Sequence, residues 1–208
     1  MEMEKTSIND SMQLSEHLAS PSEAALGHLS ELNGSRLSPH FTLGEVTKTS
    51  TGIQNIPSRV NIENLKRLCP WLEELRRRYN ERYFFEEGGK RNEEGEYFKG
   101  REEGGVRSEN REEAEEPIVI TSGYRSPEVN RAVGGSPTSN HLIGCAVDIR
   151  CAGVEQAIRY AAILLDIADE WEQDFDELLT EHNRKGRYWV HFAVKPKDNR
   201  RKILFLQK

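Results

Sequence analysis

The chain has 208 residues, of which 36% are hydrophobic and 31% are charged, and its mean hydropathy is −0.74. This length is enough for one domain with a hydrophobic core, but the charged fraction indicates that part of the chain does not pack into that core. The formal charge of −6 argues against a nucleic-acid-binding protein, because phosphate contacts need a clustered basic surface and the sequence contains none.

Cysteine usage and the first residues bear on the cellular compartment. Cys69, Cys145 and Cys151 form no CxxC pair and are too few for a disulfide scaffold, which is typical of a protein that is kept reduced or is indifferent to redox state. Residues 1–5 are acidic and polar and lack the basic and apolar parts of a signal peptide. No apolar run reaches about 18 residues, so we expect no membrane span and synthesis in the cytoplasm.

Two parts of the chain are predicted to lie outside the folded core. Residues 1–36 are rich in Ser, Glu and Asn, which predicts a disordered N-terminal tail ahead of a domain at 37–208. Between residues 81 and 116, thirteen glutamates stand against seven lysines and arginines, and two glycine pairs interrupt them. A solvated acidic helix or a partner-binding segment would carry the same charge, but the glycine pairs and the scarcity of aliphatic residues favour a disordered insertion.

The first half of the domain is predicted to be helical. Order is expected to begin near Phe41, in a short segment with apolar residues. From Val60 to Leu75 the apolar residues recur every three or four positions, which is the spacing of one buried helix face. Pro70 lies inside this pattern and predicts either a kink or a second helix that begins there and runs to Tyr79.

The second half predicts a sheet with helices. Strands are expected at 117–121, 146–150, 175–180, 188–194 and 203–206. Ser126 followed by Pro127 is a good helix start, and residues 154–171 form a strongly apolar helix that should cover the sheet. Because helices precede and interrupt the strands instead of alternating with them, we predict an α+β domain with a small antiparallel sheet and helices packed on it.

Metal-ligating residues gather around one glycine. His141 lies on a loop and Asp148 on the strand that follows, and Gly144 allows a tight bend between them, so that both side chains can converge on one ion. His191 lies in another strand-like run and would bring a third ligand. Two histidines and one carboxylate suit catalytic zinc. Either histidine alone is more often a satisfied core or loop residue, so the prediction of a metal site depends on all three.

Tyr124 and Arg125 follow the first predicted strand, at a place where loops on a rigid scaffold often carry function. The planar guanidinium of Arg125 suits a carboxylate or an oxyanion, which makes it a candidate for both catalysis and substrate binding. A surface arginine paired with Glu128 is the alternative.

Three motifs occur in the order found in the M15 peptidases, which include zinc D-Ala-D-Ala carboxypeptidases and related phage endolysins. They are SGYRS at 122–126, SNHLIGCAVD at 139–148 and WVH at 189–191. The chain resembles this family from about Phe41 to Val194, with the acidic stretch as an insertion. The resemblance implies the hedgehog/DD-peptidase-like fold, which also occurs in a signalling domain, so the fold alone does not establish catalysis.

The resemblance implies that zinc is held by His141, Asp148 and His191, with water in the fourth position. It implies a metallopeptidase that cleaves bonds to D-amino acids in peptidoglycan stem peptides, either as a carboxypeptidase or as an endolysin. The alternative is a non-catalytic zinc-containing module that binds cell-wall peptide or a protein. We expect a monomer that binds no nucleic acid and reaches the wall by a phage-type or other export route.

A peptidase also needs a group that takes the proton of water and passes it to the leaving amine. The resemblance places an acidic residue at the end of the strand before the last ligand, which is Glu181 here; a solvated loop glutamate is the alternative. Glu177 and His182 rank below it, since Glu177 shares the face of Glu181 only if the strand is regular. Ser139 either binds substrate, together with Tyr124 and Arg125, or sets the loop. Trp189 stands where some family members have a histidine.

Overall fold

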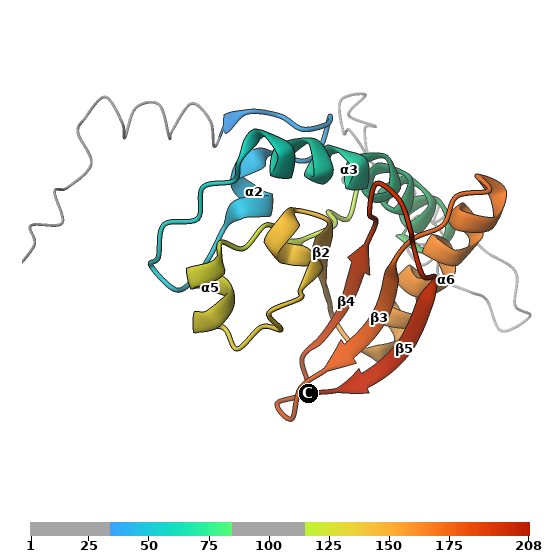
Figure 1. Cartoon of the computed structure of the whole chain (residues 1–208). Coiled ribbons are helices and arrows are strands. Elements are labelled where there is room, and N and C mark those ends of the chain that lie inside the picture. The colour runs from blue at the N-terminus through green and yellow to red at the C-terminus, as the bar shows by residue number, and fades with distance from the viewer. Residues whose placement is uncertain (1–33, 85–114) are drawn as a thin grey trace, which may run out of the picture.

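The structure, a computed structural model, describes residues 34–84 and 115–208 (Figure 1). The predicted tail at 1–36 therefore lies almost wholly outside the described residues, and so does most of the predicted acidic insertion at 81–116. The helices are α2 (Leu43–Thr47), α3 (Arg59–Tyr79), α5 (Pro127–Ala132) and α6 (Val154–Glu170), with a π-helical turn η1 (Asn80–Phe84) and a 3-10 turn η2 (Asn140–Ile143). Within the described ranges, none of these helices is long and apolar enough to cross a membrane.

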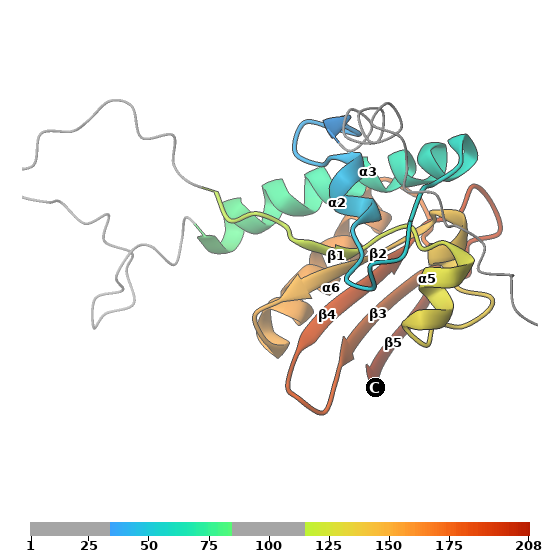
Figure 2. The ribbon, with the colours of Figure 1, turned by 90° about the vertical axis from the view of Figure 1, so that its left-hand side faces the viewer.

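The strands are β1 (Ile120–Ser122), β2 (Ala146–Cys151), β3 (Glu177–His182), β4 (Tyr188–Ala193) and β5 (Lys202–Gln207). They form one five-stranded sheet in the order β1-β2-β4-β3-β5, which can be followed from strand to strand in Figure 2. The predicted α+β class is thereby confirmed, and each of the five predicted strands is present with shifted bounds.

The prediction of an antiparallel sheet is wrong at its last strand, because β5 pairs in parallel with β3. The reason lies in where β4 ends. Ala193, the last residue of β4, is opposite Glu177, the first residue of β3. The chain then returns to that end, where Arg201 donates to the Phe175 carbonyl and Lys202 to the Asp176 carbonyl. Both β3 and β5 therefore start at the same end of the sheet and run in the same direction.

One face of the sheet carries the core and the other is left for the site. Helices α3 and α6 pack on the core face, and α6 lies behind the strands in Figures 1 and 2. The ring of Trp71 on α3 lies 5.3 Å from that of Phe192 on β4 and 5.2 Å from that of Trp171, which ends α6. Because side chains alternate along a strand, the neighbours of Phe192 point to the opposite face.

Helix α3 runs without interruption through Pro70, so the alternative of a second helix that begins at Pro70 is wrong. The helix starts at a capping box in which Ser58 and Asn61 satisfy each other's backbone N–H groups. Its buried stripe continues on both sides of the proline, from Leu65 to Leu75, and each of these two side chains is at most 1% exposed. Tertiary packing on this stripe offsets the hydrogen bond that the proline cannot make.

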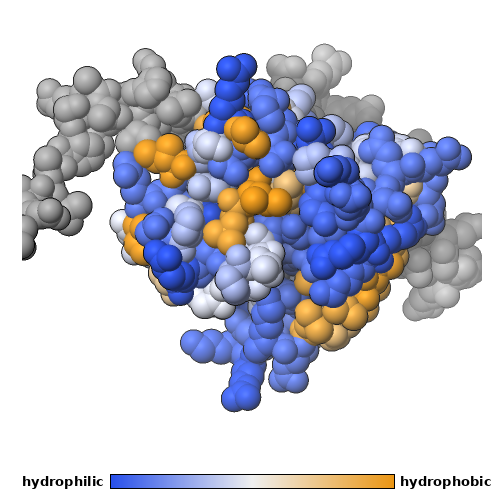
Figure 3. All heavy atoms as spheres, in the orientation of Figure 1, coloured by the Kyte–Doolittle hydropathy of each residue, from blue (hydrophilic) through white to orange (hydrophobic). Residues whose placement is uncertain are grey.

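The sheet has an exposed apolar edge at β5. Ile203, Leu204 and Phe205 are 50%, 41% and 55% exposed, and an apolar patch is visible over β5 at the lower right of Figure 3. The last strand therefore contributes little to the core, although it brings polar side chains to the face that carries the site.

The chain on the two sides of residues 85–114 is joined by side-chain hydrogen bonds. The Glu116 backbone N–H donates to Asn80 Oδ1 at 2.7 Å, and Asn80 Nδ2 donates to the Glu116 carbonyl at 3.1 Å. Asn80 and Glu116 are thus held side by side. The insertion itself stays a prediction.

Candidate active site

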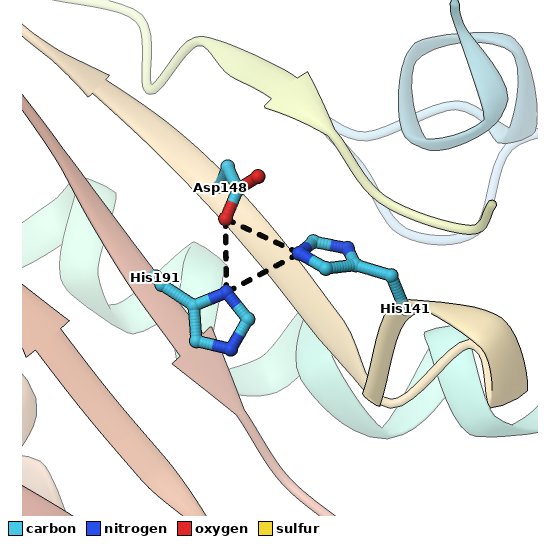
Figure 4. Close-up of side chains that lie close together, drawn as sticks. All are labelled: His141, Asp148 and His191. Carbon is cyan, nitrogen blue, oxygen red and sulfur yellow. Dashed lines mark hydrogen bonds and ion pairs between the residues drawn. The ribbon is translucent and has the colours of Figure 1, made fainter. Parts of the chain in front are cut away.

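Three ligand-type side chains converge on the open face of the sheet (Figure 4). His141 comes from η2, and the register of β2 and β4 places Asp148 opposite His191. His141 Nε2 lies 3.2 Å from Asp148 Oδ1 and 3.2 Å from His191 Nδ1, and the last two atoms are 2.9 Å apart. Bonds of about 2.0 to 2.1 Å in a tetrahedral zinc site put neighbouring ligand atoms about 3.3 Å apart. The triangle therefore has nearly the size of one face of such a tetrahedron.

Hydrogen bonds behind the two rings decide which nitrogen of each is free. The Gly123 carbonyl lies 2.6 Å from His141 Nδ1, and since a carbonyl only accepts, Nδ1 carries the proton and Nε2 of the neutral ring carries a lone pair. His191 Nε2 lies 3.5 Å from Glu177 Oε2, which favours the proton on Nε2 and leaves Nδ1 free. Two lone pairs and a carboxylate oxygen thus face one another, and this donor set fits zinc.

The loop that carries His141 depends on local backbone geometry. Gly144 has φ of 71°, and a Cβ at this position would lie 2.5 Å from the Asn61 carbonyl oxygen. This is the tight bend that the sequence predicts. On the other side of η2, the Ser139 hydroxyl accepts from the His141 N–H at 3.3 Å. Asn64 of α3 donates to the Ile143 carbonyl at 2.8 Å, so that η2 is held against the helix.

Arg125 holds the carboxylate of Asp148, one of the three candidate ligands. Its guanidinium pairs with Asp148 Oδ2, and its Nε donates to Ser122 Oγ at 2.7 Å. The alternative pairing with Glu128 is wrong, because Glu128 pairs with Arg131 at 3.3 Å. Arg125 therefore occupies the outer oxygen of Asp148 and leaves Oδ1 for the triangle.

A cavity of about 650 Å³ opens over the three ligands. Arg125, Ser139 and residues of β3 line it. Glu177 and Glu181 both line this cavity, so the strand is regular, which is the condition under which the two share a face. His182 points to the other face, where its ring stacks on that of Tyr188 with centroids 5.2 Å apart.

Part of the sequence that carries this site is similar to a known protein family. Residues 105–185 match the family model described as Peptidase M15. This part of the chain is therefore similar to the M15 peptidases. The matched region contains His141 and Asp148 and ends before β4, which supplies His191 to the same triangle. No match is found among curated proteins.

Burial and charge shift the pKa values of all three candidate ligands. Burial lowers the pKa of His141, and although burial opposes it, the nearby His141 and His191 hold the pKa of the Asp148 carboxyl well below its usual value. For His191, burial acts to lower the pKa, but hydrogen bonds with Asp148 and Glu177 outweigh it and raise the pKa to about 9. A divalent cation bound by His191 would displace the proton that these carboxylates favour on its ring.

The two glutamates of β3 have different surroundings. The hydrogen bond with His191 is the largest cause that lowers the pKa of Glu177, to about 2. Three further groups contact the Glu177 carboxylate: Asn140 Nδ2 at 3.1 Å, Arg200 at 3.0 Å and Lys202 at 3.2 Å. Glu181 is 1% exposed and pairs with Lys208 at 2.7 Å. Glu177 therefore interacts with the candidate ligand His191. Glu181 instead faces the cavity and pairs with Lys208, which follows β5.

The structure brings most of the singled-out residues to this cavity, but not Tyr124. Tyr124 is 7% exposed and packs in the hydrophobic core, outside the wall of the cavity. Its N–H donates to the Val46 carbonyl at 2.7 Å, and its carbonyl accepts from Asn55 at 2.8 Å. Tyr124 therefore anchors the chain after β1 and does not reach the cavity in which the substrate would bind.

Cationic residues near the end of the chain were missed by sequence reasoning. Arg200, Lys202 and Lys208 line the cavity from β5 and its flanks. Alternation along a strand would place Lys202 and Lys208 on one face, but only the parallel pairing with β3 brings that face to the site. The sequence held no signal for this pairing.

Proposed function

We propose that this protein is a zinc metallopeptidase of the M15 type that hydrolyses bonds to D-amino acids in peptidoglycan stem peptides. The triangle of His141, Asp148 and His191 at the base of a 650 Å³ cavity carries the proposal. A zinc ion bound there would supply a Lewis acid that activates water and polarises the scissile carbonyl. The match of residues 105–185 to the M15 family supports peptide hydrolysis, and the resemblance of the motifs to D-Ala-D-Ala carboxypeptidases and endolysins supports the choice of substrate.

Glu181 is proposed to take the proton from the attacking water and to return it to the leaving amine. Its carboxylate lines the cavity, and its partner Lys208 is 59% exposed, so the ion pair can open toward solvent. Glu177 suits this role less well, because a carboxyl with a pKa of about 2 is a weak base at neutral pH.

Arg125 and Ser139 are proposed to bind the substrate. Arg125 lies at the border of the cavity with its side chain 17% exposed, so it can hold Asp148 and still present an N–H group to a substrate oxygen. Ser139 borders the cavity while its hydroxyl accepts from the His141 N–H, so the two roles considered for it are compatible.

Metal analysis combined with mass spectrometry of digested muropeptides tests the proposal. The wild type is expected to hold about one zinc ion and to release shortened stem peptides. Glu181→Gln is expected to keep zinc and to lose roughly 10²- to 10⁴-fold in kcat. Glu177→Gln is expected to weaken zinc binding about 10- to 100-fold and to recover kcat at saturating zinc.

Glu63→Gln, an exposed change on α3, serves as the control and should match the wild type. Stoichiometric zinc without cleavage by the wild type would leave only the non-catalytic binding module. Absence of zinc would contradict that module as well as the enzyme.

A further inference from the structure

A second hollow adjoins the cavity over the ligands. It has a volume of about 610 Å³, and Asp148 and Trp189 line both spaces. Its other walls include Arg150 near the end of β2, and Asn183 and Arg187 from the loop between β3 and β4. The cleft therefore does not end at the metal ligands but continues past Asp148 to the loop.

The two spaces differ in how their charges are compensated. In the cavity over the ligands, every cationic side chain has an acidic partner; the pairs are Arg125 with Asp148, Arg200 with Asp176, Lys202 with Glu177 and Lys208 with Glu181. In the second hollow, neither Arg150 nor Arg187 forms an ion pair with any residue of 34–84 or 115–208. The acidic residue in its wall is Asp148, which Arg125 already holds. The second hollow thus presents two uncompensated guanidinium groups.

Regular structure places both arginines. Arg150 follows Asp148 by two positions on β2, so the two side chains share a face, and Arg150 lies opposite Trp189 of β4. Arg187 directly precedes β4, in a turn where Gly186 has φ of 73° and the Arg187 N–H donates to Asn183 Oδ1 at 3.1 Å. Two residues of strand span about 7 Å, so Arg150 lies one or two residues of extended peptide away from the metal ligands.

We propose that the second hollow is a subsite in which Arg150 and Arg187 bind a carboxylate of the peptide substrate, one or two residues from the cleaved bond. A guanidinium suits this group because it can donate two parallel hydrogen bonds to a carboxylate. The inference rests on the proposed function and narrows its substrate to peptides with an acidic group at that distance. The carboxylate is either a free C-terminus or an acidic side chain.

Three synthetic peptides test the subsite and distinguish the two sources. They share one cleavable bond to a D-amino acid and carry a free C-terminus with neutral side chains, an acidic side chain with an amidated C-terminus, or neither acidic group. For the zinc-loaded full chain, Arg150→Gln and Arg187→Gln are each expected to raise KM about tenfold for a carboxylated peptide, with kcat and the KM of the neutral peptide unchanged. The carboxylated peptide whose KM rises in these variants shows whether the bound carboxylate is a C-terminus or an acidic side chain.

Arg184→Gln is the matched control, since Arg184 lies in the same loop but outside both spaces. An unchanged KM, or an equal rise for the neutral peptide, overturns the subsite. If the wild type cleaves none of the peptides, the proposed function fails separately, and calorimetric titration of the same peptides decides the subsite. Weaker binding of a carboxylated peptide to Arg150→Gln and Arg187→Gln supports it, and equal binding overturns it.

Discussion

His141 shows how single residues set the orientation of a candidate metal ligand. The Gly123 carbonyl accepts from its Nδ1, so the position of Gly123 determines which nitrogen faces Asp148 and His191. Gly123 has no room for a side chain, because a Cβ there would lie 2.2 Å from the Val46 carbonyl oxygen. The ligand thus depends on a backbone contact between α2 and the end of β1.

Gly123→Ala is therefore expected to weaken zinc binding about 10- to 100-fold, because the carbonyl that orients His141 must move. Competition with a chelating indicator measures this change. Gly34→Ala is the control, since a Cβ at Gly34 meets nothing within 4 Å. Unchanged zinc affinity in Gly123→Ala, with the fold intact by circular dichroism, would show that this carbonyl does not orient the ring.

At the scale of elements, α3 forms because burial of its apolar stripe stabilises the helix by more than the proline within it costs. Pro70 has no N–H for the Lys66 carbonyl, yet the helix continues to Tyr79. The sequence predicted the helix from its apolar spacing but could not decide its continuity, because packing against α6 and the sheet stabilises both halves together.

Pro70→Ala is expected to stabilise the protein by roughly 1 to 3 kcal/mol, since alanine restores the hydrogen bond and is the better helix former. Urea unfolding followed by circular dichroism measures the free energy of unfolding. A loss of stability would mean that restriction of the unfolded chain by the proline matters more than the missing bond.

Helices α3 and α6 are also joined by a charged network. Arg78 donates to Glu74 at 2.6 Å and to Glu170 at 2.6 and 2.8 Å. The hydrogen bond from Arg77 is the largest cause that lowers the pKa of Glu74, to about 2 from an ordinary 4.5. A carboxyl whose pKa is lower in the folded state stabilises that state above its unfolded pKa and loses this contribution as the pH falls toward the folded value.

Between pH 5 and pH 2, Glu74→Gln is accordingly expected to lose less stability than the wild type, by roughly 1 to 3 kcal/mol. Urea unfolding across this range measures the difference. Glu63→Gln, at an exposed site of the same helix, should follow the wild-type curve. Parallel curves for Glu74→Gln and the wild type would show that the network does not depend on the charge of Glu74.

At the scale of the whole molecule, the metal triangle joins segments that are distant in the chain. Its members come from η2, β2 and β4, and the last of these follows α6 and β3. A cation bound by all three stabilises only the folded state, since the unfolded chain does not hold them together.

Removal of zinc by a chelator is expected to lower Tm by about 5 to 10 °C, which corresponds to roughly 2.7 kcal/mol when free zinc exceeds Kd a hundredfold. Differential scanning calorimetry of loaded and stripped protein measures the shift. His141→Ala should show almost none of it, and a shift of the full size in that variant would place the zinc elsewhere.

Much of the fold followed from local patterns. The alternation at β2 and β4, the apolar spacing of α6 and the start of α5 at Ser126 predicted elements that the structure contains. These signals depend on neighbours within one turn or one strand. The direction of β5 could not be predicted in this way, because it depends on where the chain stands after β4 and not on the composition of residues 202–207.

The sequence by itself determined the resemblance to the M15 peptidases, the α+β class and the three ligand-type residues, because spacing around Gly144 and at His191 is a local property of the chain. Only the tertiary structure decided the electrostatics around them. It paired Arg125 with Asp148 instead of Glu128 and left Arg150 without an acidic partner in the described residues. Charge compensation depends on distances between side chains on different strands, and these distances exist only once the sheet has formed.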